Sequence, residues 1–194
     1  MPNFDPLERA FEARQHLPPQ LAPVAAADLS PLQRALLVTD GTVTTLLAAW
    51  ALEPVTVRPL GQRTVPCDGA LPPAAAWLDV PAGSPVVERA VLIEGATSGR
   101  LFAFAESLIC ADRLPEALRA GLASGELSLG HLLRMPGFES RREGLWYGRE
   151  RPASLPPEVA ARGTAEFLSR TYRVTAGSKP LMVITERFPW SFRA

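Results

Sequence analysis

The stretch RTYRVTAGSKPLMVITERF, residues 170–188, is the part of the chain from which the architecture can be worked out. Both halves are rich in β-branched and aromatic residues, and AGSK between them has the composition of a turn, so we expect a β-hairpin. Side chains alternate between the two faces of a strand, which puts Ile184, Glu186 and Phe188 on one face. Glu186 therefore interrupts an apolar row. A carboxylate there is costly unless it is paired, protonated or in contact with a ligand.

The segment VVERAVLIEG, residues 86–95, has the same feature. Alternation puts Arg89 on one face with Val91 and Ile93, so a charged residue again interrupts an apolar row. RLFAFAESLIC follows after the turn GATSG, and the two segments predict a second hairpin. In one sheet, Arg89 and Glu186 would either neutralise each other as a buried ion pair or line a common pocket. In the pocket, the arginine would clamp a carboxylate and the glutamate would meet a hydroxyl.

The rest of the chain alternates between helical and extended patterns. TDGTVTTLLAAWALEP, residues 39–54, predicts a helix that Pro54 ends, and the following VTVRPLGQRTVP predicts a strand with a bulge near Gly61. We also expect two short helices in residues 112–135, a strand in residues 142–150, and a loop or short helix in residues 151–169. The order of helix, strands, helices and strands favours an α+β fold with an antiparallel β-sheet and helices packed on one face.

The size and composition of the chain fit one soluble domain. The 194 residues are 47% hydrophobic and 21% charged. Residues 1–30 are rich in proline and alanine without a sustained period, so we expect an irregular or helical lead-in before a domain that spans residues 31–194. We predict a single domain overall.

Charge and hydropathy argue against several classes of partner. The 20 Lys and Arg residues equal the 20 Asp and Glu residues, so no net positive field attracts nucleic acid or an anionic membrane. No apolar run approaches the roughly 18 to 20 residues of a membrane-spanning helix. The N-terminus has acidic residues where a signal peptide would be basic and then apolar. We expect a cytoplasmic protein with no nucleic-acid partner and no membrane contact.

The chain carries no cofactor or metal motif. Cys67 and Cys110 lie far apart, and His16 and His131 are isolated, so the spacing of a zinc site is missing. Neither G-x-G-x-x-G nor G-x-x-x-x-G-K-[ST] occurs, which removes the signals for dinucleotide and nucleoside triphosphate binding. We expect any chemistry to proceed without a metal or an organic cofactor.

The sequence resembles the chorismate lyases (chorismate pyruvate-lyases, 4-hydroxybenzoate synthases), in particular the lyase-like branch of bacterial secondary metabolism. The resemblance covers roughly residues 32–188, and its most specific part is the final hairpin with KPLMVITE. The other matching segments are LLVTDGTVTTLL, VVERAVLI, LFAFAESLICADRLPEAL and LSLGHLL. The resemblance implies a single α+β domain in which the ligand is enclosed between the sheet and helical flaps. It also implies cofactor-free elimination and aromatisation of chorismate to 4-hydroxybenzoate and pyruvate, in aromatic acid biosynthesis.

The resemblance also implies which residues form the site. The family's substrate-binding arginine corresponds to Arg89 and its glutamate to Glu186, and these two are the expected catalytic and substrate-binding residues. Main-chain contacts are implied at Val43 and at Leu129. The best-studied branch has Met where this chain has Val43 and Pro where it has Ser128, so the surroundings of the ligand are expected to differ there.

Some assignments stay open at this point. The second carboxylate of chorismate requires another cation, for which the chain offers Arg63, Arg134, Arg173 and Lys179. Glu106 also lies between apolar neighbours on one strand face, and the resemblance implies no role for it. The resemblance also implies a small-molecule substrate, chorismate, and a monomeric protein.

Two other functions compete with chorismate lyase. One is an enzyme of the same fold that acts on a relative of chorismate or gives another aromatic acid. The other is a non-catalytic sensor domain that binds a small aromatic acid. Such sensor domains normally follow a DNA-binding helix-turn-helix, and the proline-rich lead-in of about 30 residues is too short for one.

Overall fold

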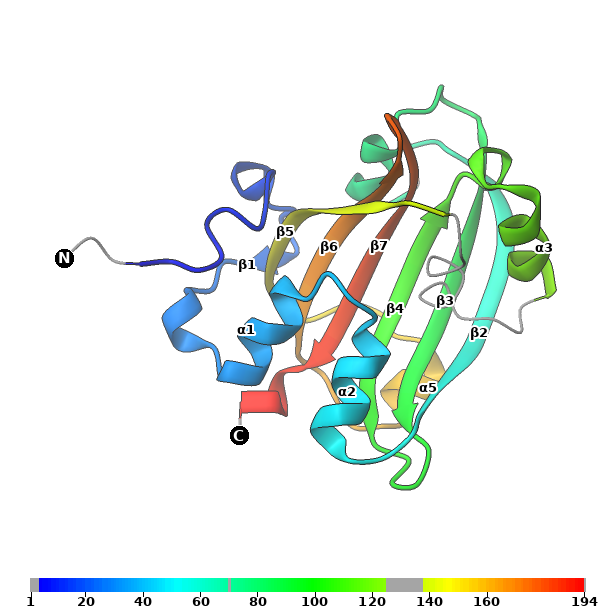
Figure 1. Ribbon diagram of the computed structural model, residues 1–194. Coiled ribbons are helices and arrows are strands. Elements are labelled where there is room, and N and C mark those ends of the chain that lie inside the picture. The colour runs from blue at the N-terminus through cyan, green and yellow to red at the C-terminus, as the bar shows by residue number, and fades with distance from the viewer. Residues whose placement is uncertain (1–3, 70, 125–137, 194) are drawn as a thin grey trace.

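The structure of the protein is a computed structural model, and it describes residues 4–69, 71–124 and 138–193. Its framework is one seven-stranded antiparallel sheet with the order β1-β5-β6-β7-β4-β3-β2 (Figure 1). The strands are β1 (Leu21–Ala22), β2 (Val55–Pro66), β3 (Pro85–Gly95), β4 (Leu101–Ile109), β5 (Arg141–Glu150), β6 (Phe167–Ala176) and β7 (Lys179–Pro189). The α+β fold predicted from the sequence is confirmed.

Short helices connect and cover the strands. The α-helices are α1 (Pro31–Val38), α2 (Val43–Ala51), α3 (Glu116–Ser124) and α5 (Pro157–Ala160). The 3-10 helices are η1 (Arg14–His16), η2 (Ala26–Asp28), η3 (Pro73–Leu78), η4 (Ala111–Arg113) and η5 (Trp190–Arg193). The second of the two helices expected in residues 112–135 lies outside the described residues.

The two predicted hairpins form as expected. β6 pairs with β7 and β3 pairs with β4, and β4 also pairs with β7, so the two hairpins lie side by side in the middle of the sheet. The predicted bulge is present in β2, where the pairing with β3 shifts between Pro59 and Gly61. Helix α2 ends at Ala51, before Pro54, because Leu52 adopts a left-handed conformation with φ 55°.

One face of the sheet, which we call the front face, is covered by α2 and α3. Val43 and Leu47 of α2 pack in the same apolar cluster as Ile93 and Phe188. Leu118 and Leu122 of α3 belong to a second cluster with Tyr172, Met182 and Ile184. Figure 1 shows α1 and α2 on the side of the sheet that faces the viewer. The apolar rows that alternation predicts are thus buried beneath these helices.

The opposite face, which we call the back face, is covered by shorter segments. Ala74, Ala75 and Leu78 of η3 share a cluster with Leu108 and Val183 of the sheet. Val159 of α5 packs in another cluster with Phe104. Ala13 and Leu21 from the first 30 residues join the η3 cluster, and β1 pairs with β5. The lead-in therefore contributes a strand and part of the core.

Helix α1 begins at a capping box that the sequence SPLQ provides. The side-chain oxygen of Ser30 accepts a hydrogen bond from the backbone N–H of Gln33, and the side chain of Gln33 accepts one from the N–H of Ser30. The amide of Gln33 also donates to the carbonyl of Trp190. This links the start of α1 to the segment after β7. Among the described residues, no helix has the length and apolar character needed to cross a membrane.

Candidate functional site

A pocket lies between the front face of the sheet and the beginning of α2. It contains about 600 Å³ of space that no atom fills, part of it open to solvent. The described residues that line it come from the loop before α2, from α2 itself and from strands β2 to β7. They are Gly41, Thr42, Val43, Thr44, Val57, Arg89, Val91, Ile93, Ala105, Ser107, Arg142, Tyr172, Ile184 and Glu186. Most of its wall is apolar, so a few polar groups determine what it can bind.

The register of the central strands brings Arg89 and Glu186 to this pocket. Arg89 is opposite Ser107 of β4, and Ser107 is opposite Ile184 of β7. Glu186 is two residues further along β7, on the same face. Two strand spacings and two residue steps separate the Cα atoms of Arg89 and Glu186 by roughly 12 Å. Two long side chains that line one pocket at this separation leave room between them for one small ring.

Glu186 is buried and paired with Arg170, its direct partner on β6. Nε and Nη2 of Arg170 both lie 2.7 Å from Oε2 of Glu186. Nη1 of Arg170 donates to the carbonyl oxygens of Leu37 and Thr39, at 3.2 and 3.1 Å. Arg170 therefore neutralises the carboxylate and ties it to the end of α1, so the burial of this charge is compensated.

The other oxygen of Glu186 faces Tyr172. The Tyr172 hydroxyl donates to Oε1 at 3.2 Å. Burial, followed by the negative charge of Glu186, raises the pKa of Tyr172 well above its ordinary value. The phenol therefore stays protonated and remains a donor. Because Arg170 contacts Oε2 and Tyr172 approaches Oε1 alone, Oε1 has capacity to accept a second hydrogen bond from a ligand hydroxyl.

Arg89 brings a positive charge into the apolar part of the pocket. Arg89 is only 3% exposed, and this burial lowers the pKa of its guanidinium. Arginine nevertheless keeps its proton in proteins, so the group remains a cation with a planar array of N–H donors. A carboxylate is the small ligand group that matches this array.

The beginning of α2 supplies a second kind of donor. Thr42 is the N-cap, and the carbonyl of Thr42 accepts the first hydrogen bond of the helix, from the N–H of Thr45. The N–H groups that precede this first bond have no partner within an α-helix and, together with the helix dipole, favour a negative group. Val43 is in this turn and lines the pocket. A carboxylate near Arg89 can thus also meet main-chain donors.

Arg142 is a further cation at the pocket. It lies near the start of β5 and is mostly buried. Its Nη1 donates to the carbonyl oxygen of Asp40 and lies 3.8 Å from the Asp40 carboxylate, whose side chain is 83% exposed. An ion pair with so exposed a partner is weak. The described residues that line the pocket thus include two arginines and one glutamate.

The structure brings together three of the four site residues predicted from the sequence. Arg89, Glu186 and Val43 all line this pocket, whereas Leu129 lies outside the described residues. Of the two interpretations, the common pocket is the one that the structure shows, because Arg89 and Glu186 both line it. The predicted ion pair between these two residues is wrong in its partner, since Glu186 forms its buried ion pair with Arg170.

The candidates for a second cation are located elsewhere. Arg63 pairs with Glu88 at 2.7 Å and Arg173 pairs with Glu143 at 2.6 Å, while Lys179 begins β7 in an exposed position. Arg134 lies outside the described residues. Arg142, which was not among these candidates, lines the pocket instead.

Arg170 and Tyr172, which contact Glu186, were also not predicted from the sequence as site residues. In their case a signal existed, because alternation along RTYRV puts both residues on the same face as the buried Val174. No group of three or more His, Cys, Asp or Glu side chains suited to a metal ion occurs in residues 4–69, 71–124 and 138–193.

Comparison with known proteins gives matches in sequence and in structure. Residues 37–194 match the model of the family described as "Chorismate pyruvate-lyase Rv2949c-like". A chorismate pyruvate-lyase of Mycobacterium tuberculosis H37Rv is 32% identical over 161 residues, which cover 80% of this chain and 78% of that protein. One of Mycobacterium leprae is 30% identical over the same length, covering 80% of this chain and 72% of the relative.

Two of the solved structures that match are PhnF and its effector domain. PhnF from Mycobacterium smegmatis superimposes with a TM-score of 0.60 at 16% identity, over 81% of this chain and 67% of PhnF. Its effector domain alone gives a TM-score of 0.57 at 16% identity, over 78% of this chain and 90% of that domain. At this identity, the likeness concerns the fold alone.

Proposed function

The chain belongs to the Rv2949c-like chorismate pyruvate-lyase family, and on this premise we propose that it converts chorismate to 4-hydroxybenzoate and pyruvate. The observation that carries the proposal is the arrangement of polar groups in the front-face pocket. Arg89 and Glu186 face it from strands β3 and β7, with apolar side chains between them. This matches a ring that has a carboxylate at one end and a hydroxyl at the other.

The proposed binding mode follows from the donors and acceptors at each end. The ring carboxylate binds the guanidinium of Arg89 and the main-chain N–H groups near Val43. The ring hydroxyl donates to Oε1 of Glu186. Arg142 binds the second carboxylate, on the enolpyruvyl group, and Leu129 is expected to contribute a main-chain contact. Two cations suit a substrate with two carboxylates.

The chemistry requires little beyond this binding mode. The C–O bond between the ring and the enolpyruvyl oxygen breaks, and that oxygen leaves with the electron pair. The hydrogen on the neighbouring hydroxyl-bearing carbon leaves as a proton, and the ring becomes aromatic. The departing enolate takes up a proton to give pyruvate. Aromatisation drives the reaction, so the protein has to hold one conformer and stabilise the charge on the leaving oxygen. Arg142 supplies a positive charge on that side.

The test is to incubate the purified protein with chorismate and to measure pyruvate and aromatic acid by chromatography. We expect equimolar pyruvate and 4-hydroxybenzoate. Arg89→Ala and Glu186→Gln should each lower kcat/KM by at least about 30-fold, because loss of one partner of a buried polar contact costs about 2 kcal/mol or more. Arg63→Gln, which removes an exposed arginine outside this pocket, is the control and should retain the wild-type rate.

Other outcomes of this experiment distinguish the alternative functions. Equimolar pyruvate with a different aromatic acid would indicate an enzyme of the same fold with another product. Binding of chorismate or 4-hydroxybenzoate without turnover would indicate a sensor domain instead. We propose further that the protein acts as a monomer in the cytoplasm, which light scattering and cell fractionation test directly.

A further inference from the structure

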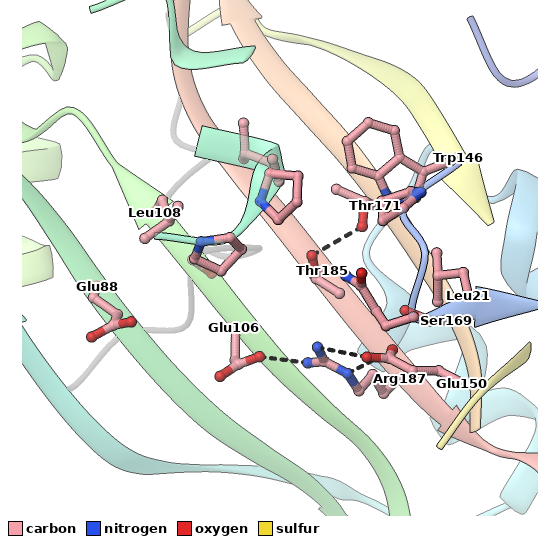
Figure 2. A pocket seen from close by; sticks show the side chains of 17 residues that line it. Leu21, Glu88, Glu106, Leu108, Trp146, Glu150, Ser169, Thr171, Thr185 and Arg187 are labelled. Carbon is pink, nitrogen blue, oxygen red and sulfur yellow. Dashed lines mark hydrogen bonds and ion pairs between the residues drawn. The ribbon is translucent and has the colours of Figure 1, made fainter. Parts of the chain in front are cut away.

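A second pocket lies on the back face of the sheet, on the side away from Arg89. It contains about 590 Å³ of space that no atom fills, part of it open to solvent. Its floor is formed by β4, β6 and β7, and its walls come from the start of η3 and from the lead-in around β1. The apolar part of its lining includes Pro18, Leu21, Pro73, Leu108 and Trp146. Figure 2 shows this pocket from close by.

Arg187 is at the centre of the polar part of this back-face pocket, between two carboxylates (Figure 2). Its Nη1 donates to Oε2 of Glu106 at 2.5 Å, and its Nε donates to Oε2 of Glu150 at 2.8 Å. Burial lowers the pKa of Arg187, but the charges of Glu150 and Glu106 outweigh this effect and the pKa is raised. Arg187 is thus a permanent cation that already has two carboxylate partners.

This arrangement leaves negative charge in excess. Two carboxylates share one guanidinium, and Glu88, which also lines the pocket, is paired with the exposed Arg63. Glu150 is buried and contacts Arg187 through both of its oxygens. The Glu106 side chain is 46% exposed, and its Oε1 has no partner in the described part of the chain. Glu106 therefore offers an accessible negative oxygen at the mouth of the pocket.

Three hydroxyl groups lie beside the charged cluster. Thr171 and Thr185 hydrogen-bond each other at 2.9 Å. Ser169 is 1% exposed, lines the pocket, and its Oγ has no hydrogen-bond partner among the described residues. In Figure 2, Ser169 lies between the threonine pair and the Arg187–Glu150 pair. An unpaired buried hydroxyl costs stability, so the packing of the sheet gives no reason for a serine at this position.

We propose that the back-face pocket binds a small primary amine with an apolar body and a hydroxyl group. The ammonium pairs with Glu106, the apolar body lies against Trp146 and Leu108, and the hydroxyl meets Ser169. This inference goes beyond the proposed function, because the ligand differs in charge from chorismate. The front-face pocket has two arginines to one glutamate in its described lining, whereas the back-face pocket has three glutamates to one arginine.

Three probes of nearly equal shape test the charge preference. Tyramine carries an ammonium, tyrosol a neutral hydroxyl, and 4-hydroxyphenylacetate a carboxylate, each on the same hydroxyphenyl body. Calorimetric titration of the intact protein should give tighter binding for tyramine than for tyrosol, by about tenfold, and weaker binding for 4-hydroxyphenylacetate at this pocket. Magnetisation transfer between tyramine and the Trp146 indole, identified with Trp146→Phe, should locate the bound probe.

Two variants test the residues that carry the inference. Glu106→Gln should weaken tyramine about tenfold and leave tyrosol unchanged, whereas Glu158→Gln, an exposed carboxylate on α5, should change neither. Ser169→Ala removes the unpaired hydroxyl, so it should weaken both probes and leave the melting temperature of the free protein equal or higher. The proposal is overturned if tyramine does not bind, if the three probes bind alike, or if neither variant weakens tyramine. None of these results depends on lyase activity.

Discussion

Glu186 has two hydrogen-bonded neighbours inside the sheet, and each has a different consequence. Arg170 compensates the buried charge, and Tyr172 donates to the oxygen that faces the pocket. A carboxyl group held in this way is fixed in direction before any ligand arrives. Such preorganisation lowers the cost of binding a ligand hydroxyl.

Removal of the buried cation should expose this dependence. Arg170→Met leaves Glu186 as an unpaired buried carboxylate, so we expect the free energy of unfolding to fall by about 3 to 5 kcal/mol. Adding Glu186→Gln to that variant removes the unpaired charge and should recover about 0.5 to 3 kcal/mol. Urea denaturation of the four proteins in this cycle measures both effects. A double variant no more stable than Arg170→Met would contradict the pairing.

Tyr172 should make stability depend on pH in the alkaline range. Its pKa is raised in the folded protein, so the unfolded chain loses this proton first as the pH rises. The contribution is therefore fully present below about pH 10 and is lost above it, at up to about 1.4 kcal/mol per pH unit. Tyr172→Phe should unfold with a correspondingly shallower decline above pH 10. Equal slopes for the wild type and the variant, from denaturation at several pH values, would refute the assignment.

Arg142 should contribute more to the binding of the substrate than to the binding of the product, since only chorismate carries the second carboxylate. Arg142→Gln should raise KM for chorismate about 10- to 100-fold, the value of one charge-assisted contact, and leave the inhibition constant of 4-hydroxybenzoate nearly unchanged. The neighbouring Arg141→Gln is the control, because that side chain is 76% exposed and contacts Glu143. An equal rise in both constants for Arg142→Gln would mean that Arg142 acts on the pocket as a whole.

Among the elements, two glycines at bulges in the sheet have different environments. The pairing of β5 with β6 shifts between Gly144 and Trp146, and the pairing of β2 with β3 shifts between Pro59 and Gly61. A Cβ atom at Gly144 would overlap the carbonyl oxygen of Ala10, because the lead-in bridges to β5 there. A Cβ atom at Gly61 would meet nothing within 4 Å.

This difference gives a matched pair of substitutions. Gly144→Ala should lower the free energy of unfolding by about 1 to 3 kcal/mol, because the backbone of the lead-in must move to make room. Gly61→Ala should change it by no more than about 0.5 kcal/mol. Thermal denaturation of both variants measures the difference. Similar values for the two would mean that the lead-in is not held against β5.

The strands whose residues alternate strictly could be predicted from the sequence. The contacts that depend on how two strands pair could not. Alternation along VVERAVLIEG and PLMVITERF was sufficient to identify Arg89 and Glu186, since both interrupt apolar rows. The partner of Glu186 depends on the register between β6 and β7, and register is a property of two strands rather than of either one. The same alternation in RTYRV marks Arg170, but its partner emerges only from the pairing.

Arg142 as a pocket residue and the back-face pocket could not be predicted from the sequence, for a different reason. Arg142 reaches the front-face pocket because β5 begins beside the loop before α2, a contact between segments about 100 residues apart. The back-face pocket needs the lead-in and the start of η3 to cover the same part of the sheet. Glu106 was visible as an anomaly on an apolar face, and its partner Arg187 became apparent only with the sheet order.

In the whole molecule, one sheet carries two pockets of opposite charge preference. Neighbouring residues of one strand line different pockets, as Glu186 and Arg187 of β7 do. Ser107 lines both pockets. The family relationship and the front-face geometry support the same reaction, while the fold is also that of regulator effector domains. The position of the bound ligand is therefore the most direct test of the proposed function.

The most direct measurement is a crystal structure of the protein with 4-hydroxybenzoate. We predict that the acid lies between α2 and the front face, with its carboxylate on Arg89 and the N–H groups near Val43 and its hydroxyl on Oε1 of Glu186. An acid bound with its two ends exchanged, or bound only in the back-face pocket, would contradict the proposed binding mode.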